Sequence, residues 1–459
     1  MTHSYTTHFS KTILLSFPVI VAQLGNVMMG LIDNLMIGEL GYVPLSASSL
    51  ANGIYILLTV MGIGISFAMS ALVAEADTAG KDHDVRALFQ QGGWLGLFVG
   101  MILAILVWGS ALLLPFMNQP EEDVVLAMPY LQIIALSAVP QMIFLAGKHL
   151  ADGLSFTKAS MYITITALGV NVFFNWLLIN GNWGFPALEL NGAGYATLIS
   201  RIFMMALMIW YILRKADFRT YQLWDGWQRI RPDVMGRILR IGIPSGLQYF
   251  FEVAAFIGTT VMIGWLENGS LQRSAHQIAL QMASLTYMVV WGLSAGSAIR
   301  VGNALGQKDL PNLRRAGIAG TWLAVIFMSV SAVVMVIWRT EFSALFVDNQ
   351  AVIDLAAGLL ILGALFQLFD GIQAVGIGIL RGIQDVKLPT IYTFIAYWVI
   401  ALPVGYLFGF EFEKGVEGIW YGLVLGLLFA SVVLLARFRI LTRPDGALSQ
   451  SWQVKSNSA

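Results

Sequence analysis

Three acidic residues, Asp33, Glu252 and Asp370, lie within long apolar segments of the chain. A charged side chain at the centre of a membrane helix costs about 2.5–3.5 kcal/mol, and no Lys or Arg in these segments is obviously placed to neutralise it. Such a carboxylate takes up a proton or holds a cation. We therefore interpret the three acids as coupling sites for an ion, rather than as residues that only link helices.

Glutamine side chains accompany the two acids of the second half. Gln248 precedes Glu252 by four residues, and Gln367 and Gln373 flank Asp370 at a spacing of three. Residues three or four apart share one face of a helix. The amides are therefore expected beside the carboxylates, where they could contribute to an ion or substrate site. Hydrogen bonds that only hold helices together explain the same pattern equally well.

The first half contains a similar group of polar residues. Asn171 and Asn175 are four residues apart, and Thr197 lies in a later apolar segment. The two amides share a helix face and could supply oxygen ligands, to which Thr197 could add a hydroxyl. Here too, hydrogen bonds between helices are the alternative explanation.

The segments that must position these side chains are predicted to be membrane helices. The chain is 58% apolar and 11% charged, with a mean hydropathy of +0.75, whereas a soluble domain carries about 25% charged residues. A helix of about 20 mostly apolar residues crosses a bilayer. We expect an all-α, multi-pass membrane protein with twelve transmembrane helices, at residues 11–37, 46–75, 92–114, 127–148, 159–180, 192–213, 236–265, 273–300, 316–338, 352–380, 388–410 and 417–437.

The basic residues predict which side of the membrane each loop faces. If the N-terminus is cytoplasmic, the 26 Lys and Arg residues all fall on the cytoplasmic side except Arg201, Arg273, Arg339 and Lys414. This asymmetry follows the positive-inside rule. Both termini are therefore expected in the cytoplasm, and the inner membrane of a bacterium is the expected location.

An internal repeat divides the chain. A shift of 226 residues places Pro18 on Pro244 and aligns several further positions of the two halves. We therefore predict six-helix bundles at residues 1–215 and 236–459, joined by a cytoplasmic interfacial linker at 216–235. Because each half has an even number of spans, the axis relating them should run along the membrane normal.

The repeat does not preserve the acidic residues. At shifts of 226 or 229 residues, the aligned pairs are Asp33 with Thr259, Glu252 with Asn26, and Asp370 with Gln141. The two halves are therefore expected to contain two unlike sites.

Motifs of several enzyme classes are absent from the sequence. It contains no GxxxxGK[ST] phosphate-binding loop, no HExxH zinc motif and no GxSxG nucleophile elbow. Cysteine is also absent, which excludes thiolate chemistry. We expect no catalytic residues, no cofactor, no tightly bound metal and no nucleic-acid partner. An ion gradient is the natural energy source, since one charge crossing 100 mV supplies about 2.3 kcal/mol.

Four segments resemble the multidrug and toxic compound extrusion (MATE) family. They are FPVIVAQLGNVMMGLIDNLMIGELG, NGAGYATLIS, LQYFFEVAAF and LFQLFDGIQAVGIGILRGIQDVKLP. The likeness covers essentially the whole chain. The Glu at position 252 and the Asp at position 370 resemble the NorM branch of the family. The resemblance implies a V-shaped pair of six-helix bundles that exports organic cations and drugs in exchange for Na+ or H+, with access alternating between the two sides. A monomer is expected to suffice.

The resemblance also implies two cation sites. Glu252 and Asp370 match the cation site of the second half, while Asp33, Asn171, Asn175 and Thr197 match that of the first. The sequence departs from the family at Asn175, where some relatives have an acid. This difference lowers the negative charge of the first site and leaves its ion preference open.

Two alternative functions remain. A flippase for lipid-linked saccharides would need a cationic cavity, and no Arg or Lys is expected to interrupt the core of a span. A membrane-embedded transferase would need a nucleophile, base or metal motif, and none is found in the sequence.

Overall fold

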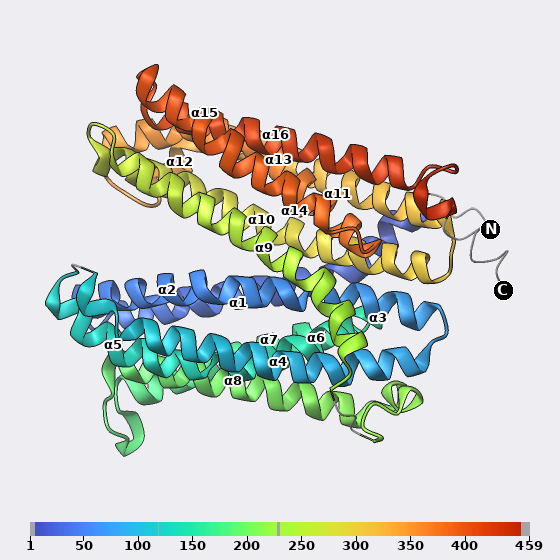
Figure 1. The fold of residues 1–459 in the computed structure, drawn as a ribbon. Helices are drawn as coiled ribbons and strands as arrows, with labels where there is room; N and C mark the ends of the chain where they lie inside the picture. Colours follow the sequence, from blue (N-terminus) through green and yellow to red (C-terminus); the bar gives the residue numbers. More distant parts are fainter. Residues whose placement is uncertain (1–4, 118, 227–229, 451–459) are drawn as a thin grey trace. The chain divides into compact units, whose positions relative to one another are not determined.

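The structure, a computed structural model, describes residues 5–117, 119–226 and 230–450. Within these residues it contains helices and no strands, and twelve helical segments are long and apolar enough to cross a membrane, as predicted. The α-helices (Figure 1) are α1 (Tyr5–Gly38), α2 (Tyr42–Ser66), α3 (Ala68–Thr78), α4 (Asp82–Ala111), α5 (Glu121–Leu136), α6 (Ala138–Gly153), α7 (Lys158–Ile179), α8 (Glu189–Arg214), α9 (Pro232–Gly264), α10 (Gly269–Gly306), α11 (Leu310–Ile337), α12 (Arg339–Ala344), α13 (Gln350–Gly382), α14 (Lys387–Phe394), α15 (Leu402–Tyr406) and α16 (Gly415–Leu441).

Within the described residues, three of the spans are interrupted. The second span breaks at Phe67, between α2 and α3, and the fourth breaks at Ser137, between α5 and α6. Pro140 follows this second break and cannot donate a hydrogen bond to the carbonyl four residues earlier. The eleventh span contains a π-helical stretch at Ile395–Ala401, just before Pro403, where the same missing donor favours an altered hydrogen-bond pattern.

The helix contacts group the chain into two bundles whose limits differ from the predicted ones. The N-bundle comprises Val21–Gly246, and the C-bundle comprises Met1–Ile20 together with Leu247–Ala459. The divisions therefore fall inside α1 and α9, each two residues after a proline, Pro18 or Pro244.

The predicted linker lies within the N-bundle because its backbone is hydrogen-bonded to α4. The Arg86 guanidinium donates to the Tyr221 carbonyl at 3.1 Å, and the Gln90 amide donates to the Leu223 carbonyl at 3.0 Å. The Tyr221 hydroxyl donates to Asp77 at 2.5 Å. Burial and this hydrogen bond raise the pKa of Tyr221 above its ordinary value. Residues 227–229 of the linker lie outside the described chain.

The first turns of α1 belong to the C-bundle through contacts with α10. The Arg300 guanidinium donates to the His8 carbonyl and to the Thr12 hydroxyl, each at 2.7 Å. In the N-bundle, the first turns of α9 pack on α2 in the corresponding way. A Cβ atom added to Gly64 would lie 2.6 Å from the Gly246 Cα atom, so the two backbones are in contact.

We expect Gly64→Ala to lower the stability of the protein by about 1–3 kcal/mol, because the added methyl group overlaps the backbone of α9. Thermal unfolding of the purified protein in detergent measures the change. Gly169→Ala, on α7, is the matched control, since a Cβ atom there meets nothing within 4 Å. An unchanged melting temperature for Gly64→Ala would contradict the close contact between α2 and α9.

Candidate cation sites in the two bundles

The N-bundle brings together all four residues predicted for the first site. Asp33 is buried on α1, and the Asn175 amide of α7 donates to its Oδ1 atom at 2.5 Å. The same amide donates to Asn171 Oδ1 at 3.2 Å. The Thr197 hydroxyl of α8 donates to Asp33 Oδ2 at 3.4 Å. One carboxylate is thus surrounded by two amides and a hydroxyl; their use as a cation site stays a prediction.

Two amide atoms of this site lack partners. Asn175 Oδ1 and Asn171 Nδ2 are buried, and neither has a hydrogen-bond partner among the described residues. A buried polar atom without a partner costs about 1–3 kcal/mol. Turning the Asn175 amide would direct its oxygen at Asp33, an arrangement that is favourable when a proton or a metal cation lies between the two oxygens. The carboxylate and amide oxygens of the site are atoms that could accept a proton or coordinate Na+, and such binding stays a prediction.

The C-bundle holds Glu252 on α9 and Asp370 on α13, both buried. The Tyr287 hydroxyl of α10 donates to Glu252 Oε1 at 3.2 Å. The two carboxylates lie within electrostatic range of each other, and Tyr397 lies within range of both. Among the described residues, no side chain donates a hydrogen bond to Asp370. Two neighbouring buried acids repel each other when ionised, so the pair favours an added positive charge.

The three glutamines bond to neighbouring helices rather than to the acids. Gln248 donates to the Thr393 hydroxyl at 2.9 Å, and Gln373 donates to the Tyr397 hydroxyl at 3.2 Å. Gln367 lies on α13, and its Oε1 atom accepts from the Thr286 hydroxyl at 2.9 Å. These contacts fit the alternative explanation for the glutamines, that their hydrogen bonds hold neighbouring helices together. Gln373 is linked to the acids through its partner Tyr397, which lies within electrostatic range of both of them.

Arg201 corrects an expectation from the sequence. The distribution of basic residues places it on the outer side, yet it lies midway along α8 and is half-buried in the N-bundle. Its Nη1 atom donates to the hydroxyls of Tyr55 and Ser137, each at 2.5 Å, and its Cζ atom lies 4.7 Å from the centre of the Tyr55 ring. The expectation that no basic residue interrupts a span core was therefore wrong. The spacing of four from Thr197 was the signal that could have placed Arg201 on the same helix face.

Arg381 also lies near a predicted site, the acid pair Glu252 and Asp370. The distribution of basic residues places it on the cytoplasmic side. In the structure it belongs to the last turn of α13 and lies within electrostatic range of Glu252. The acids of both bundles therefore have a guanidinium in their surroundings.

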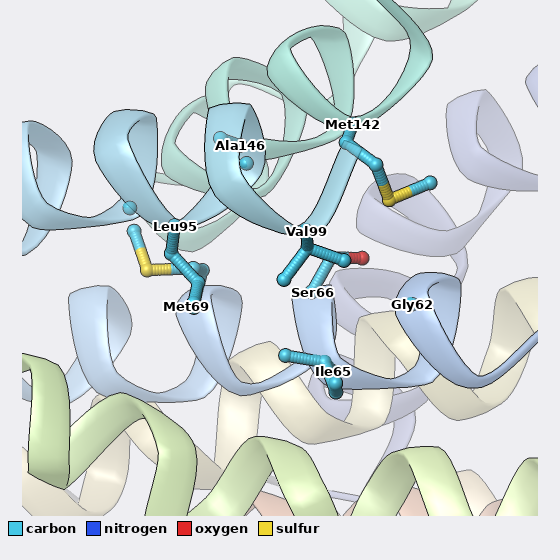
Figure 2. A pocket seen from close by; sticks show the side chains of 10 residues that line it. Gly62, Ile65, Ser66, Met69, Leu95, Val99, Met142 and Ala146 are labelled. Carbon is cyan, nitrogen blue, oxygen red and sulfur yellow. The ribbon is translucent and has the colours of Figure 1, made fainter. Parts of the chain in front are cut away.

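An apolar pocket in the N-bundle lies apart from these polar groups. Figure 2 shows its lining, which includes Met69, Leu95, Val99 and Met142 from α3, α4 and α6. Ser66 supplies the only hydroxyl among the lining side chains. The pocket therefore offers mainly packing surface, and its lining contains no charged side chain for ion binding.

The MatE family model matches residues 18–177 and 244–407. The chain belongs to the MatE family of multidrug and toxic compound extrusion transporters. The two matched regions of this MatE transporter begin 226 residues apart, which is the offset of the internal repeat. The protein is therefore a multi-pass membrane transporter and not an enzyme.

Individual relatives agree with this assignment. The chain is 33% identical to the probable multidrug resistance protein NorM of Rhizobium meliloti, over 98% of this chain and 97% of the relative. It is 31% identical to the multidrug resistance protein NorM of Photobacterium profundum, over 95% and 96%. The predicted NorM-like branch is thereby confirmed.

Solved structures show the same fold. The crystal structure of the eukaryotic MATE transporter AtDTX14 superposes with a TM-score of 0.86 at 20% identity, over 96% of this chain and 97% of that one. A MOP superfamily transporter from Pyrococcus furiosus also gives a TM-score of 0.86, at 19% identity and over 95% and 96%.

Proposed function

We propose that this MatE transporter exports organic cations and drugs by antiport with Na+ or H+, through alternating access. The observation that carries the proposal is the pair of buried acids in the C-bundle, Glu252 and Asp370. Acids inside a membrane span are costly and mark ion pathways. The NorM relatives, described as multidrug resistance proteins, support drugs as the substrate class.

The exchange follows from the charge of the acids. A coupling cation at Glu252 and Asp370 neutralises the site and weakens its attraction for a cationic drug. A bound drug cation in turn disfavours the coupling cation. The two ligands therefore compete, and an inward cation gradient can drive outward drug movement. In the N-bundle, Asp33 with Asn171, Asn175 and Thr197 provides a second place for the coupling cation.

The proposed location is the bacterial inner membrane, with both termini in the cytoplasm and the monomer as the working unit. The positive-inside distribution of Lys and Arg supports this orientation. The bacterial NorM relatives support the location.

Arg201 gives some support to an anionic cargo such as a lipid-linked saccharide. A phosphate-bearing head group would need several cationic donors in a cavity. Arg201 is a single guanidinium, engaged with Tyr55 and Ser137 and within electrostatic range of Asp33. Drug export therefore remains the preferred function.

Ethidium export from proteoliposomes tests the proposal. We expect purified protein to move ethidium against its gradient when a Na+ gradient alone or a pH gradient alone is imposed, and the effective gradient identifies the coupling ion. Protein-free liposomes are the control. Ethidium movement that neither gradient accelerates would contradict antiport.

A further inference from the structure

Arg201 is fixed inside the N-bundle beside the predicted cation site. It follows Thr197 by four residues on α8, so its side chain leaves the helix on the face that bonds to Asp33. The hydroxyls of Tyr55, on α2, and Ser137, at the break between α5 and α6, hold the guanidinium at 2.5 Å. Three parts of the bundle thus determine where this charge lies.

Asp33 and Arg201 interact through space rather than as a direct ion pair. Arg201 lies within electrostatic range of Asp33, and Tyr130 lies within range of both. In the described part of the chain, no ion pair includes either residue. Tyr55 and Tyr130 are the other ionisable side chains that interact with this pair there. A positive charge held near a carboxylate opposes the binding of a second cation without occupying its oxygen atoms.

The C-bundle has the opposite arrangement. Asp370 is a second acid beside Glu252, whereas its counterpart in the repeat is the neutral Gln141. Gln141 accepts a hydrogen bond at 2.6 Å from Tyr55, which is one of the two residues that hold Arg201. The N-bundle position that corresponds to Asp370 is therefore bonded to a residue that holds a guanidinium, whereas the C-bundle position is itself an acid. In the N-bundle, the single acid Asp33 lies within electrostatic range of the Arg201 guanidinium. In the C-bundle there are two acids, and Arg381 lies within range of one of them, Glu252.

We propose that Arg201 determines the cation affinity of the N-bundle by serving as a fixed internal counter-charge to Asp33. The N-bundle consequently binds the coupling cation weakly, and the Glu252–Asp370 pair binds it tightly. This inference rests on the proposed function and assigns unequal roles to its two sites. When the cation leaves the N-bundle, Asp33 is still compensated by the guanidinium. The C-bundle pair instead needs either the coupling cation or a cationic substrate.

Cation binding to the full-length chain tests this role. The background carries Glu252→Gln and Asp370→Asn, so that Asp33 is the remaining acid of interest. Binding of radioactive Na+ is measured at constant pH, and proton uptake is measured without Na+, to distinguish the two possible coupling ions. Adding Arg201→Gln is expected to raise the affinity for the coupling cation about tenfold, because one opposing charge is removed.

Two matched variants separate charge from structure. Arg201→Lys keeps the positive charge and should retain the weak native affinity. Adding Asp33→Asn to the Arg201→Gln protein should remove the gained binding. Unchanged or reduced affinity in Arg201→Gln, or a similar gain in Arg201→Lys, would overturn the proposal. Failure of the proposed function is recognised separately, by ethidium export of the unmodified chain that responds to neither gradient.

Discussion

A protein carrying Glu252→Gln and Asp370→Asn is expected to lose gradient-driven ethidium export, to the level of liposomes without protein. The double change removes both buried acids of the C-bundle but preserves the size of their side chains. Without the negative charge, neither the coupling cation nor a cationic drug is held there, so their competition ends. Export rates at equal amounts of reconstituted protein measure the effect.

Asp354→Asn is the matched control for this double variant. Asp354 lies on α13, as Asp370 does, but it is exposed and accepts a hydrogen bond from Gln350 at 2.8 Å. We expect its loss to leave export unchanged. Full export by the Glu252→Gln, Asp370→Asn protein would contradict the role of the buried acids.

Replacing Asp33 with Asn is expected to reduce export about tenfold or more and to destabilise the N-bundle. The change removes the carboxylate that accepts from Asn175 and Thr197, and it leaves the Arg201 charge uncompensated. A charge inside a membrane span without compensation is costly. Export in proteoliposomes and thermal unfolding in detergent measure the two effects.

A compensating change separates the two consequences of Asp33→Asn. Adding Arg201→Gln removes the uncompensated charge, so the melting temperature should recover while export stays low. If Asp33→Asn exported ethidium at the native rate, the N-bundle site would have no part in transport.

Composition and hydropathy were sufficient to predict the twelve spans, because each bilayer crossing needs a long apolar helix. They could not predict where the bundles divide. Pro18 and Pro244 occupy equivalent positions in the repeat, and the chain passes from one bundle to the other just after each of them. Close contacts such as that between Gly64 and Gly246 determine this division. Sequence periodicity does not reveal which helix meets which.

The N-bundle residues were predictable one by one, because Asp33 is an acid inside an apolar segment, Asn171 and Asn175 share a helix face, and Thr197 offers a hydroxyl. The family resemblance grouped the four into one site. The glutamines show the limit of this reasoning. Spacing placed Gln248 on the face of Glu252, but its amide turns to Thr393 instead. An amide can bond in several directions, and its choice depends on neighbouring helices that the sequence does not identify.

Arg201 was misplaced for a related reason. Counting basic residues assigned it to the outer side, although it lies inside a predicted span. A long side chain can be held within a bundle only when partners such as Tyr55 and Ser137 are present. Those partners lie far away in sequence, so hydropathy alone could not identify them.

The most direct test of cation exchange reverses the driving force. An ethidium gradient is imposed across proteoliposomes that have equal Na+ and equal pH on both sides, and cation flux is followed with Na+ and pH indicators. Antiport predicts that Na+ or H+ moves opposite to ethidium, and that the flux disappears in the Glu252→Gln, Asp370→Asn protein. Ethidium movement without any counterflow of Na+ or H+ would contradict the mechanism.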